Sequence, residues 1–174
     1  MDNKHNYIYY LEGPDGSGKT TLANKIAEIK KASNIHSSFD KDWDIKKYHD
    51  NMMEAVQLIL PYTSVILDRW AISEKIYGEI FRGKPSYNVI DYLWENEDKL
   101  NNAIFIYCRN NNVIRNHIEN QKIRFEMYND MSNVIKSYDG FIDDNPLQYN
   151  WIIYDYTEND IEEFVKQLPG KNYN

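Results

Sequence analysis

A glycine-rich loop near the N-terminus constrains the fold of this 174-residue chain more than any other feature. It reads Gly13-Pro14-Asp15-Gly16-Ser17-Gly18-Lys19-Thr20, follows the apolar run 7–11 and opens a helical pattern of apolar residues. Strand, glycine-rich turn and helix form the context in which this P-loop motif binds phosphate. The glycines let backbone N–H groups surround a phosphate chain, and the helix N-terminus adds partial positive charge. The motif therefore predicts a nucleoside triphosphate site.

The polar residues of the loop have separate expected tasks. Lys19 reaches the β- and γ-phosphates, and the Thr20 hydroxyl takes a coordination position on Mg²⁺. We expect further contacts with the nucleotide from Gly13, Asp15, Gly16, Ser17, Gly18 and Thr21. The predicted phosphate donor is ATP, with Mg²⁺ as cofactor.

Short apolar runs alternate with helical patterns along the whole chain. The expected strands are residues 7–11, 35–39, 64–68, 103–108 and 151–154. The expected helices are about 19–31, 45–59, 71–80, 89–94, 113–118, 127–138 and 161–168. Gly140 is a candidate for the residue that ends the sixth of these helices, and Thr157 with Asp160 resembles a capping box for the last.

This alternation predicts a parallel sheet covered by helices on both faces. The fold class is therefore α/β: a three-layer P-loop fold with a five-stranded parallel sheet and a short helical lid at about 113–125. The length suits one domain, residues 1–174. In such sheets ligands bind at the carboxyl ends of the strands, so residues just after each strand are candidates for the site.

Charge and composition exclude several classes of partner. The net charge of −7 argues against nucleic acid, whose binding depends on many Lys and Arg contacts with phosphate. No apolar run approaches the ~18 residues of a membrane span. Cys108 is the only cysteine, lies in an apolar run and indicates a buried thiol in a reducing compartment. The four histidines show no metal-ligand spacing. We expect a cytoplasmic protein, in the host cytoplasm if the chain is viral, and leave a homodimer open.

A second site for an anion is predicted directly after the third strand. The run 64–68 ends in Asp68, which is followed by Arg69 and Trp70. An acid at this position commonly supports Mg²⁺. An arginine beside the metal would oppose its charge, but it makes sense if a second phosphate is held there by a bidentate guanidinium. A surface salt bridge is the alternative interpretation of Arg69.

More basic residues gather later in the chain, at Arg109, Arg115, Lys122 and Arg124. Such groups in a closing lid could stabilise the charge that spreads over a migrating phosphoryl group, although any solvated helix carries Lys and Arg as well. No general base is evident near the two anion sites. A phosphate acceptor needs none because its oxygen is already ionised, whereas a hydroxyl acceptor would need a carboxylate. A nucleoside monophosphate is therefore the predicted acceptor.

Two motifs resemble those of the thymidylate kinase family. Residues 11–21 resemble its P-loop, which typically reads EGxDGxGKTT, and residues 68–77 resemble its second motif, DR(Y/H)xxSxxAY. The resemblance implies that Asp15 contacts the 3′-hydroxyl of the acceptor sugar, that Arg69 holds its phosphate and that Tyr77 packs on the deoxyribose. Small size and a compact lid are also similar to phage-encoded nucleotide kinases.

The resemblance also carries departures. Gly16 stands where one branch of the family has an arginine, which assigns the catalytic arginine to the lid: Arg115, with Lys122 or Arg124 as alternatives. Gly78 replaces the glutamine of the second motif. The phenylalanine and arginine that read thymine have no clear match. Of the aromatic residues in this part of the chain, Phe39 and Trp43 are our candidates for the acceptor site.

These observations predict ATP-dependent phosphorylation of a deoxynucleoside monophosphate, with dTMP to dTDP as the leading choice. The predicted catalytic residues are Lys19, Asp68, Arg69 and Arg115, and the predicted metal ligands are Thr20 and Asp68. A deoxynucleoside kinase that uses Glu12 as base for a 5′-hydroxyl is the main alternative. A polynucleotide 5′-kinase and a nucleotide-binding switch without enzymatic activity are weaker ones.

Overall fold

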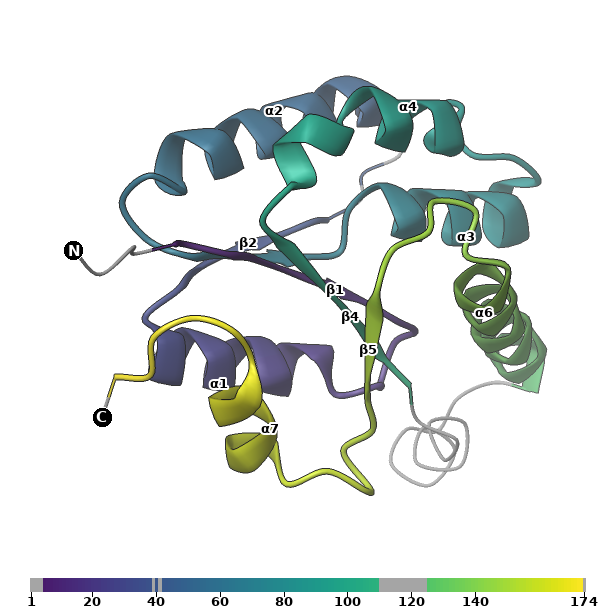
Figure 1. The fold of residues 1–174 in the computed structure, drawn as a ribbon. Helices are drawn as coiled ribbons and strands as arrows, with labels where there is room; N and C mark the ends of the chain where they lie inside the picture. The colour runs from purple at the N-terminus through teal and green to yellow at the C-terminus, as the bar shows by residue number, and fades with distance from the viewer. Residues whose placement is uncertain (1–4, 39, 41, 110–124, 174) are drawn as a thin grey trace.

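Five parallel strands form a sheet in the order β2-β3-β1-β4-β5 (Figure 1). The computed structural model describes residues 5–38, 40, 42–109 and 125–173. The strands are β1 (Ile8–Glu12), β2 (Ser33–His36), β3 (Val65–Asp68), β4 (Ala103–Cys108) and β5 (Trp151–Tyr154). The strand order and the flanking helices confirm the predicted P-loop α/β fold.

Helices cover both faces of this sheet. They are α1 (Lys19–Lys30), α2 (Ile45–Ile59), α3 (Ala71–Arg82), α4 (Val89–Glu95), α6 (Phe125–Asp144), α7 (Ile161–Gln167) and the 3₁₀ helix η1 (Glu97–Leu100). Helices α1 and α7 pack on one face, and α2, α3, α4 and α6 pack on the other (Figure 1). No helix in the described ranges is both long and apolar enough to cross a membrane.

The central strand β1 shows why the strands read as continuous apolar runs. Ile8 and Tyr10 belong to the core under α2 and α3, whereas Tyr9 and Leu11 belong to the core over α1. All four side chains are fully buried because both faces of the sheet are covered. The alternation of side chains along the strand thus feeds two separate cores.

The register of the strands brings two loops together at one edge of the sheet. Leu11 of β1 lies opposite Asp68 of β3 and Ile106 of β4. The P-loop follows β1 directly, and Arg69 follows β3 directly. Parallel strands that end level place these loops side by side, at the edge where such sheets bind ligands.

Most ends lie within one or two residues of the predictions, and three differences are of another kind. Strand β2 spans Ser33–His36 rather than 35–39, because it pairs with β3 from Val65 to Asp68 and ends where its partner ends. Helix α6 passes Gly140 and ends at Asp144. There Asn145 takes the left-handed conformation (φ 38°). Its side-chain amide donates to the Tyr149 carbonyl and accepts a hydrogen bond from the Tyr149 N–H.

The third difference concerns the start of α7. Its N-cap is Asp160, whose carboxylate accepts a hydrogen bond from the Glu163 N–H, and not Thr157. The hydroxyl and N–H of Thr157 instead donate to Asp155. The predicted helix 113–118 lies outside the described residues, and so does most of the predicted lid at 113–125, of which only the last residue falls in α6.

Candidate functional site

The loop between β1 and α1 has a backbone that requires glycine at several positions. Gly13, Gly16 and Gly18 have φ angles of 144°, 77° and 84°. A Cβ on Gly13 would lie 2.3 Å from the carbonyl oxygen of Cys108, so glycine allows the loop to approach β4. Gly18 is the N-cap of α1 and provides no side-chain cap. The N–H groups of the first turn of α1 are therefore placed to bind an anion.

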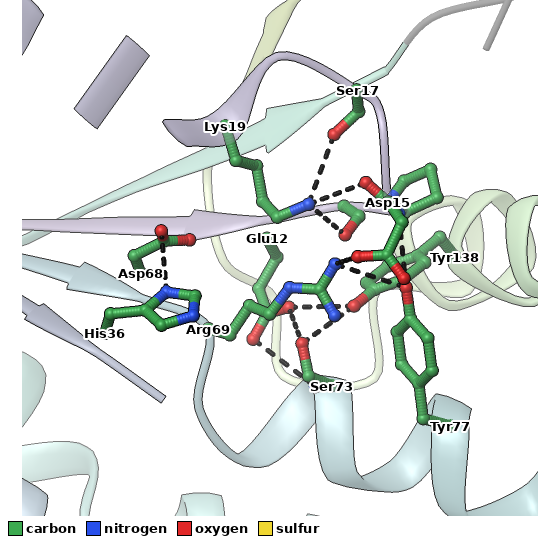
Figure 2. Close-up of polar contacts among 12 residues, drawn as sticks. Glu12, Asp15, Ser17, Lys19, His36, Asp68, Arg69, Ser73, Tyr77 and Tyr138 are labelled. Carbon is green, nitrogen blue, oxygen red and sulfur yellow. Dashed lines mark hydrogen bonds and ion pairs between the residues drawn. The ribbon is translucent and has the colours of Figure 1, made fainter. Parts of the chain in front are cut away.

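The side chain of Lys19 is buried and turns back toward the carbonyl groups of this loop. Its Nζ donates to the carbonyl oxygens of Gly13 at 2.7 Å and Pro14 at 2.6 Å, and it lies 3.4 Å from Ser17 Oγ (Figure 2). Burial, together with the nearby charge of Arg69, lowers the pKa of Lys19 to about 8. A phosphate at this position would supply the negative charge that the buried ammonium lacks.

A cavity of about 650 Å³ opens over the loop, and we call it the P-loop cavity. Its lining residues are Asp15, Gly16, Gly18, Lys19, Thr20, Thr21, His36, Asp68, Arg69, Tyr154 and Tyr156. Six of the eight predicted ATP-binding residues thus line this cavity, and the other two, Gly13 and Ser17, are buried. The Tyr156 ring packs closely against Gly18, since a Cβ on this glycine would lie 2.9 Å from the ring.

Asp68 and Thr20 line the same cavity and fit a hydrated Mg²⁺ ion. Asp68 is buried, and its Oδ2 lies 2.9 Å from His36 Nδ1. Its Oδ1 is also buried and has no hydrogen-bond partner among the described residues, an arrangement that costs free energy until a cation or water meets it. The described residues hold no group of three His, Cys, Asp or Glu side chains that could bind a metal. Phosphate and water would therefore supply the remaining ligands of the ion, as is common for Mg²⁺.

Three residues that the sequence assigned to the acceptor contact one another beside the P-loop (Figure 2). Arg69 Nη2 donates to Asp15 Oδ1 at 2.5 Å and to the Tyr77 hydroxyl at 3.2 Å. The Tyr77 hydroxyl also accepts from the Asp15 N–H, and the guanidinium lies 4.9 Å from the centre of the Tyr77 ring. The predicted grouping of Asp15, Arg69 and Tyr77 is thus present in the folded chain.

The backbone and surroundings of Arg69 single it out further. It has a positive φ of 66°, which is uncommon for a residue with a side chain and marks positions held by their surroundings. Its N–H donates to the Leu11 carbonyl, which extends the pairing of β1 with β3 by one residue. Burial alone would lower the pKa of Arg69, but nearby Tyr138, Tyr77, Asp15 and Glu12 raise it overall. The guanidinium is therefore cationic at all working pH values.

A second cavity of about 300 Å³ lies along α3, and we call it the α3 cavity. It is lined by Ser37, Ser38, Ile45, His49, Arg69, Trp70, Ser73, Glu74, Tyr77, Phe81 and Arg82. Arg69 lines both cavities, so the two adjoin at this residue. Trp43, a predicted acceptor residue, is 44% exposed and packs against the Tyr48 ring, with centroids 4.8 Å apart. Phe39 lies outside the described residues.

Glu12, at the end of β1, is a buried centre of hydrogen bonds behind Arg69 (Figure 2). Its Oε1 accepts from the Tyr10 hydroxyl at 2.9 Å and from the N–H groups of Trp70 and Ser73. Its Oε2 accepts from the Ser73 hydroxyl at 2.7 Å and the Tyr138 hydroxyl at 3.1 Å. Glu12 therefore ties the strand that carries the P-loop to the start of α3 and to α6.

The predicted lid residues cannot be placed in this site. Arg115, Lys122 and Arg124 lie outside the described residues. Arg109, the remaining member of the basic set, follows β4 and pairs through Nε with Asp139 Oδ1 of α6 at 3.2 Å.

Cys108 is buried, and burial raises the pKa of its thiol to about 12, so it is inert.

Comparison with known proteins finds similarity in structure only. No protein-family model matches the sequence, and no curated protein matches it at the required significance. Among solved structures, YorR of Bacillus subtilis in complex with phosphorylated GDP is similar, with a TM-score of 0.71 and 22% identity over 91% of each chain.

Two further structures are similar over most of their length. Deoxyadenosine kinase from M. mycoides with dCMP and dCDP has a TM-score of 0.60 and 16% identity, covering 91% of this chain and 95% of the other. Thymidylate kinase from Candida albicans has a TM-score of 0.58 and 16% identity, covering 94% of this chain and 89% of the other. The protein therefore has the fold of P-loop nucleotide kinases, at low sequence identity to each of these structures.

Proposed function

We propose that this protein transfers a phosphoryl group from ATP to a deoxynucleoside monophosphate. The observation that carries the proposal is the position of Arg69, the residue that lines both the P-loop cavity and the α3 cavity. A triphosphate in the first cavity and a monophosphate in the second would meet at this guanidinium. Arginine binds phosphate in a bidentate geometry, so Arg69 can hold the acceptor in line with the donor.

On the donor side, the residues of the P-loop cavity divide the work. The glycine-rich backbone and the N-terminus of α1 bind the phosphates, and Lys19 turns from the carbonyls that it now contacts toward the β- and γ-phosphates. Thr20 and Asp68 would hold Mg²⁺, which neutralises phosphate charge when bound. Arg115 of the predicted lid remains our candidate for stabilising the migrating charge.

On the acceptor side, Asp15, Arg69 and Tyr77 contact one another; Arg69 and Tyr77 line the α3 cavity, and Asp15 lines the P-loop cavity. Arg69 binds the acceptor phosphate, Asp15 accepts a hydrogen bond from the 3′-hydroxyl, and the Tyr77 ring packs against the deoxyribose. Burial raises the pKa of Tyr77 to about 12, so its hydroxyl stays neutral there. The resemblance to thymidylate kinases makes dTMP, giving dTDP, the first member of this class to test.

The bonding of Glu12 disfavours the main alternative, a kinase that acts on the 5′-hydroxyl of a nucleoside. Such a kinase needs a carboxylate that can accept the hydroxyl proton. Both oxygens of Glu12 already accept hydrogen bonds from tyrosine or serine hydroxyls, and Oε1 accepts two from backbone N–H groups as well. Since a deoxyadenosine kinase is among the structural neighbours, this alternative belongs in the same assay.

The test is a panel of acceptors incubated with ATP·Mg²⁺, and the release of ADP is the quantity measured. We expect turnover with at least one of dAMP, dCMP, dGMP and dTMP, and none with the matching deoxynucleosides. Arg69→Ala should raise KM for the acceptor or lower kcat by roughly 100-fold or more, since it removes a charged contact made in the transition state. Lys75→Ala, on the surface of α3, is the control. Turnover of nucleosides alone would refute the proposal.

A further inference from the structure

The α3 cavity contains more polar groups than an acceptor phosphate and sugar require. Arg69 and Tyr77 stand where it adjoins the P-loop cavity. Glu74, His49 and Arg82 line the same cavity. If Arg69 binds the acceptor phosphate, as in the proposed function on which this inference rests, these three side chains are left to face the base.

Glu74 is a buried carboxylate with acceptor capacity to spare. Its side chain is 4% exposed, and it pairs with Arg82 of the same helix. The two hydrogen bonds that described residues give it, from Arg82 Nη2 and from the Ser86 N–H at 2.7 Å, both end on Oε1. An ionised carboxylate has about four lone-pair sites and no donor. Glu74 can therefore accept hydrogen bonds from a ligand in the cavity but can give none.

His49 faces the cavity from α2 and adds no charge. Its Nδ1 lies 2.5 Å from the Tyr87 hydroxyl, and burial lowers the pKa of its imidazole to about 4. A neutral imidazole offers one donor and one acceptor. The negative charge of Glu74 is balanced by Arg82 and not by His49. The feature of a base that would gain most from this cavity is therefore an N–H donor that faces Glu74.

We propose that the α3 cavity selects an acceptor whose base carries an exocyclic amine, and that Glu74 is the residue that recognises it. Adenine, cytosine and guanine each have an amino group at their edge. Thymine has no exocyclic amine, and its one Watson–Crick donor, N3–H, lies between the O2 and O4 carbonyls, so a carboxylate that approaches this N–H meets like partial charge on both sides. The preferred acceptors are thus dAMP, dCMP or dGMP, in place of the dTMP that the resemblance suggested.

A purely structural role for Glu74 is the competing explanation. The carboxylate also fastens the segment after α3, since Ser86 lies beyond the turn at Gly83. In that case its replacement would alter stability without changing the relative rates on different bases. Ratios of kcat/KM measured within one variant separate the two roles, because partial unfolding lowers the rate on every acceptor alike.

The first experiment uses the wild-type protein with ATP·Mg²⁺ and pairs of acceptors that differ in the amine. Deoxyinosine monophosphate replaces dGMP or dAMP, and dUMP replaces dCMP. We expect kcat/KM to favour at least one amine-bearing acceptor over dTMP by roughly tenfold or more, and its partner without the amine to lose a similar factor. This result needs no variant and so does not depend on how a variant folds.

The second experiment compares Glu74→Gln with Glu79→Gln. Glu79 lies on the same helix, is partly exposed and pairs with Lys75, so its replacement makes the same chemical change outside the cavity. A glutamine amide both donates and accepts, so Glu74→Gln should bring the amine-to-dTMP ratio down toward one, whereas Glu79→Gln should leave it unchanged.

Two results would overturn the inference while leaving the proposed function intact. One is a wild-type protein that uses dTMP as well as or better than the amine-bearing acceptors. The other is a ratio that Glu74→Gln does not change in a variant whose thermal unfolding is cooperative. Absence of turnover with every monophosphate would instead refute the proposed function, and the inference with it.

Discussion

Acidification should destabilise this protein through His49. The imidazole is buried beside Trp70 and Tyr87, and burial lowers its pKa from 6.5 to about 4, although Glu74 and Asp50 partly oppose the shift. Between these two values the unfolded chain binds a proton and the folded chain does not. The free energy of unfolding therefore rises with pH in this window and is lost as the pH falls from 6.5 toward 4.

The size of the effect follows from the two pKa values. Proton linkage gives a loss of about 2 kcal/mol between pH 7.5 and pH 5, approaching about 3 kcal/mol below pH 4. For a chain of this length the loss at pH 5 corresponds to a fall in Tm of about 4–8 °C. No comparable loss is expected between pH 7.5 and pH 9 from this residue, because it is neutral in both states there.

Urea unfolding of wild type and His49→Gln at pH 7.5 and pH 5 measures the effect. Glutamine can still hydrogen-bond the Tyr87 hydroxyl but does not titrate, so the variant should lose about 2 kcal/mol less than wild type on acidification. His5→Gln is the control, since His5 is exposed. An equal pH dependence in wild type and His49→Gln would show that His49 is not held neutral by burial.

Three further substitutions test the site. Lys19→Ala should lower kcat for ATP turnover by roughly 100-fold or more while changing Tm little, because its proposed task is to bind the phosphates; an unchanged kcat would show that Lys19 does not act on the phosphate donor. Glu12→Ala leaves the Tyr10 hydroxyl and the N–H groups of Trp70 and Ser73 without their acceptor and should cost about 3 kcal/mol or more in urea unfolding, so a cost under about 1 kcal/mol would show that these hydrogen bonds contribute little to stability. Gly18→Ala should weaken ATP binding and lower Tm more than Gly83→Ala, because both have a positive φ but only Gly18 abuts Tyr156; equal effects would show that this contact is unimportant.

The fold could be predicted because its signals are local. The apolar runs that became β1, β3 and β4 have both faces buried, and the helices between them repeat apolar residues at helical spacing. These patterns fix the type of each element without reference to distant residues. The errors fell at ends, as with β2 and α6, where the pairing of β2 with β3 and the turn at Asn145 decide the boundary.

The P-loop part of the candidate site could be predicted for the same reason, because its residues are contiguous in the chain. The α3 cavity was not, because α2, α3 and the residues after β2 meet there only when the sheet forms. A weak signal existed at His49, a polar residue on the buried stripe with Ile45, Met52 and Val56. Glu74 likewise lies on the buried face of α3. Polar residues at such positions are expensive unless they are bonded or used.

The ion pair between Arg69 and Asp15 has a consequence for how the two proposed substrates affect each other's binding. The guanidinium is held by a carboxylate of the P-loop itself, with Arg69 Nη2 2.5 Å from Asp15 Oδ1. In the proposed reaction, a monophosphate bound at Arg69 would compete with Asp15 for Nη2, and the P-loop would then be less tightly tied to the residue that follows β3. We expect synergy between the two substrates in initial-rate kinetics, with each lowering the dissociation constant of the other, and Asp15→Asn should diminish it.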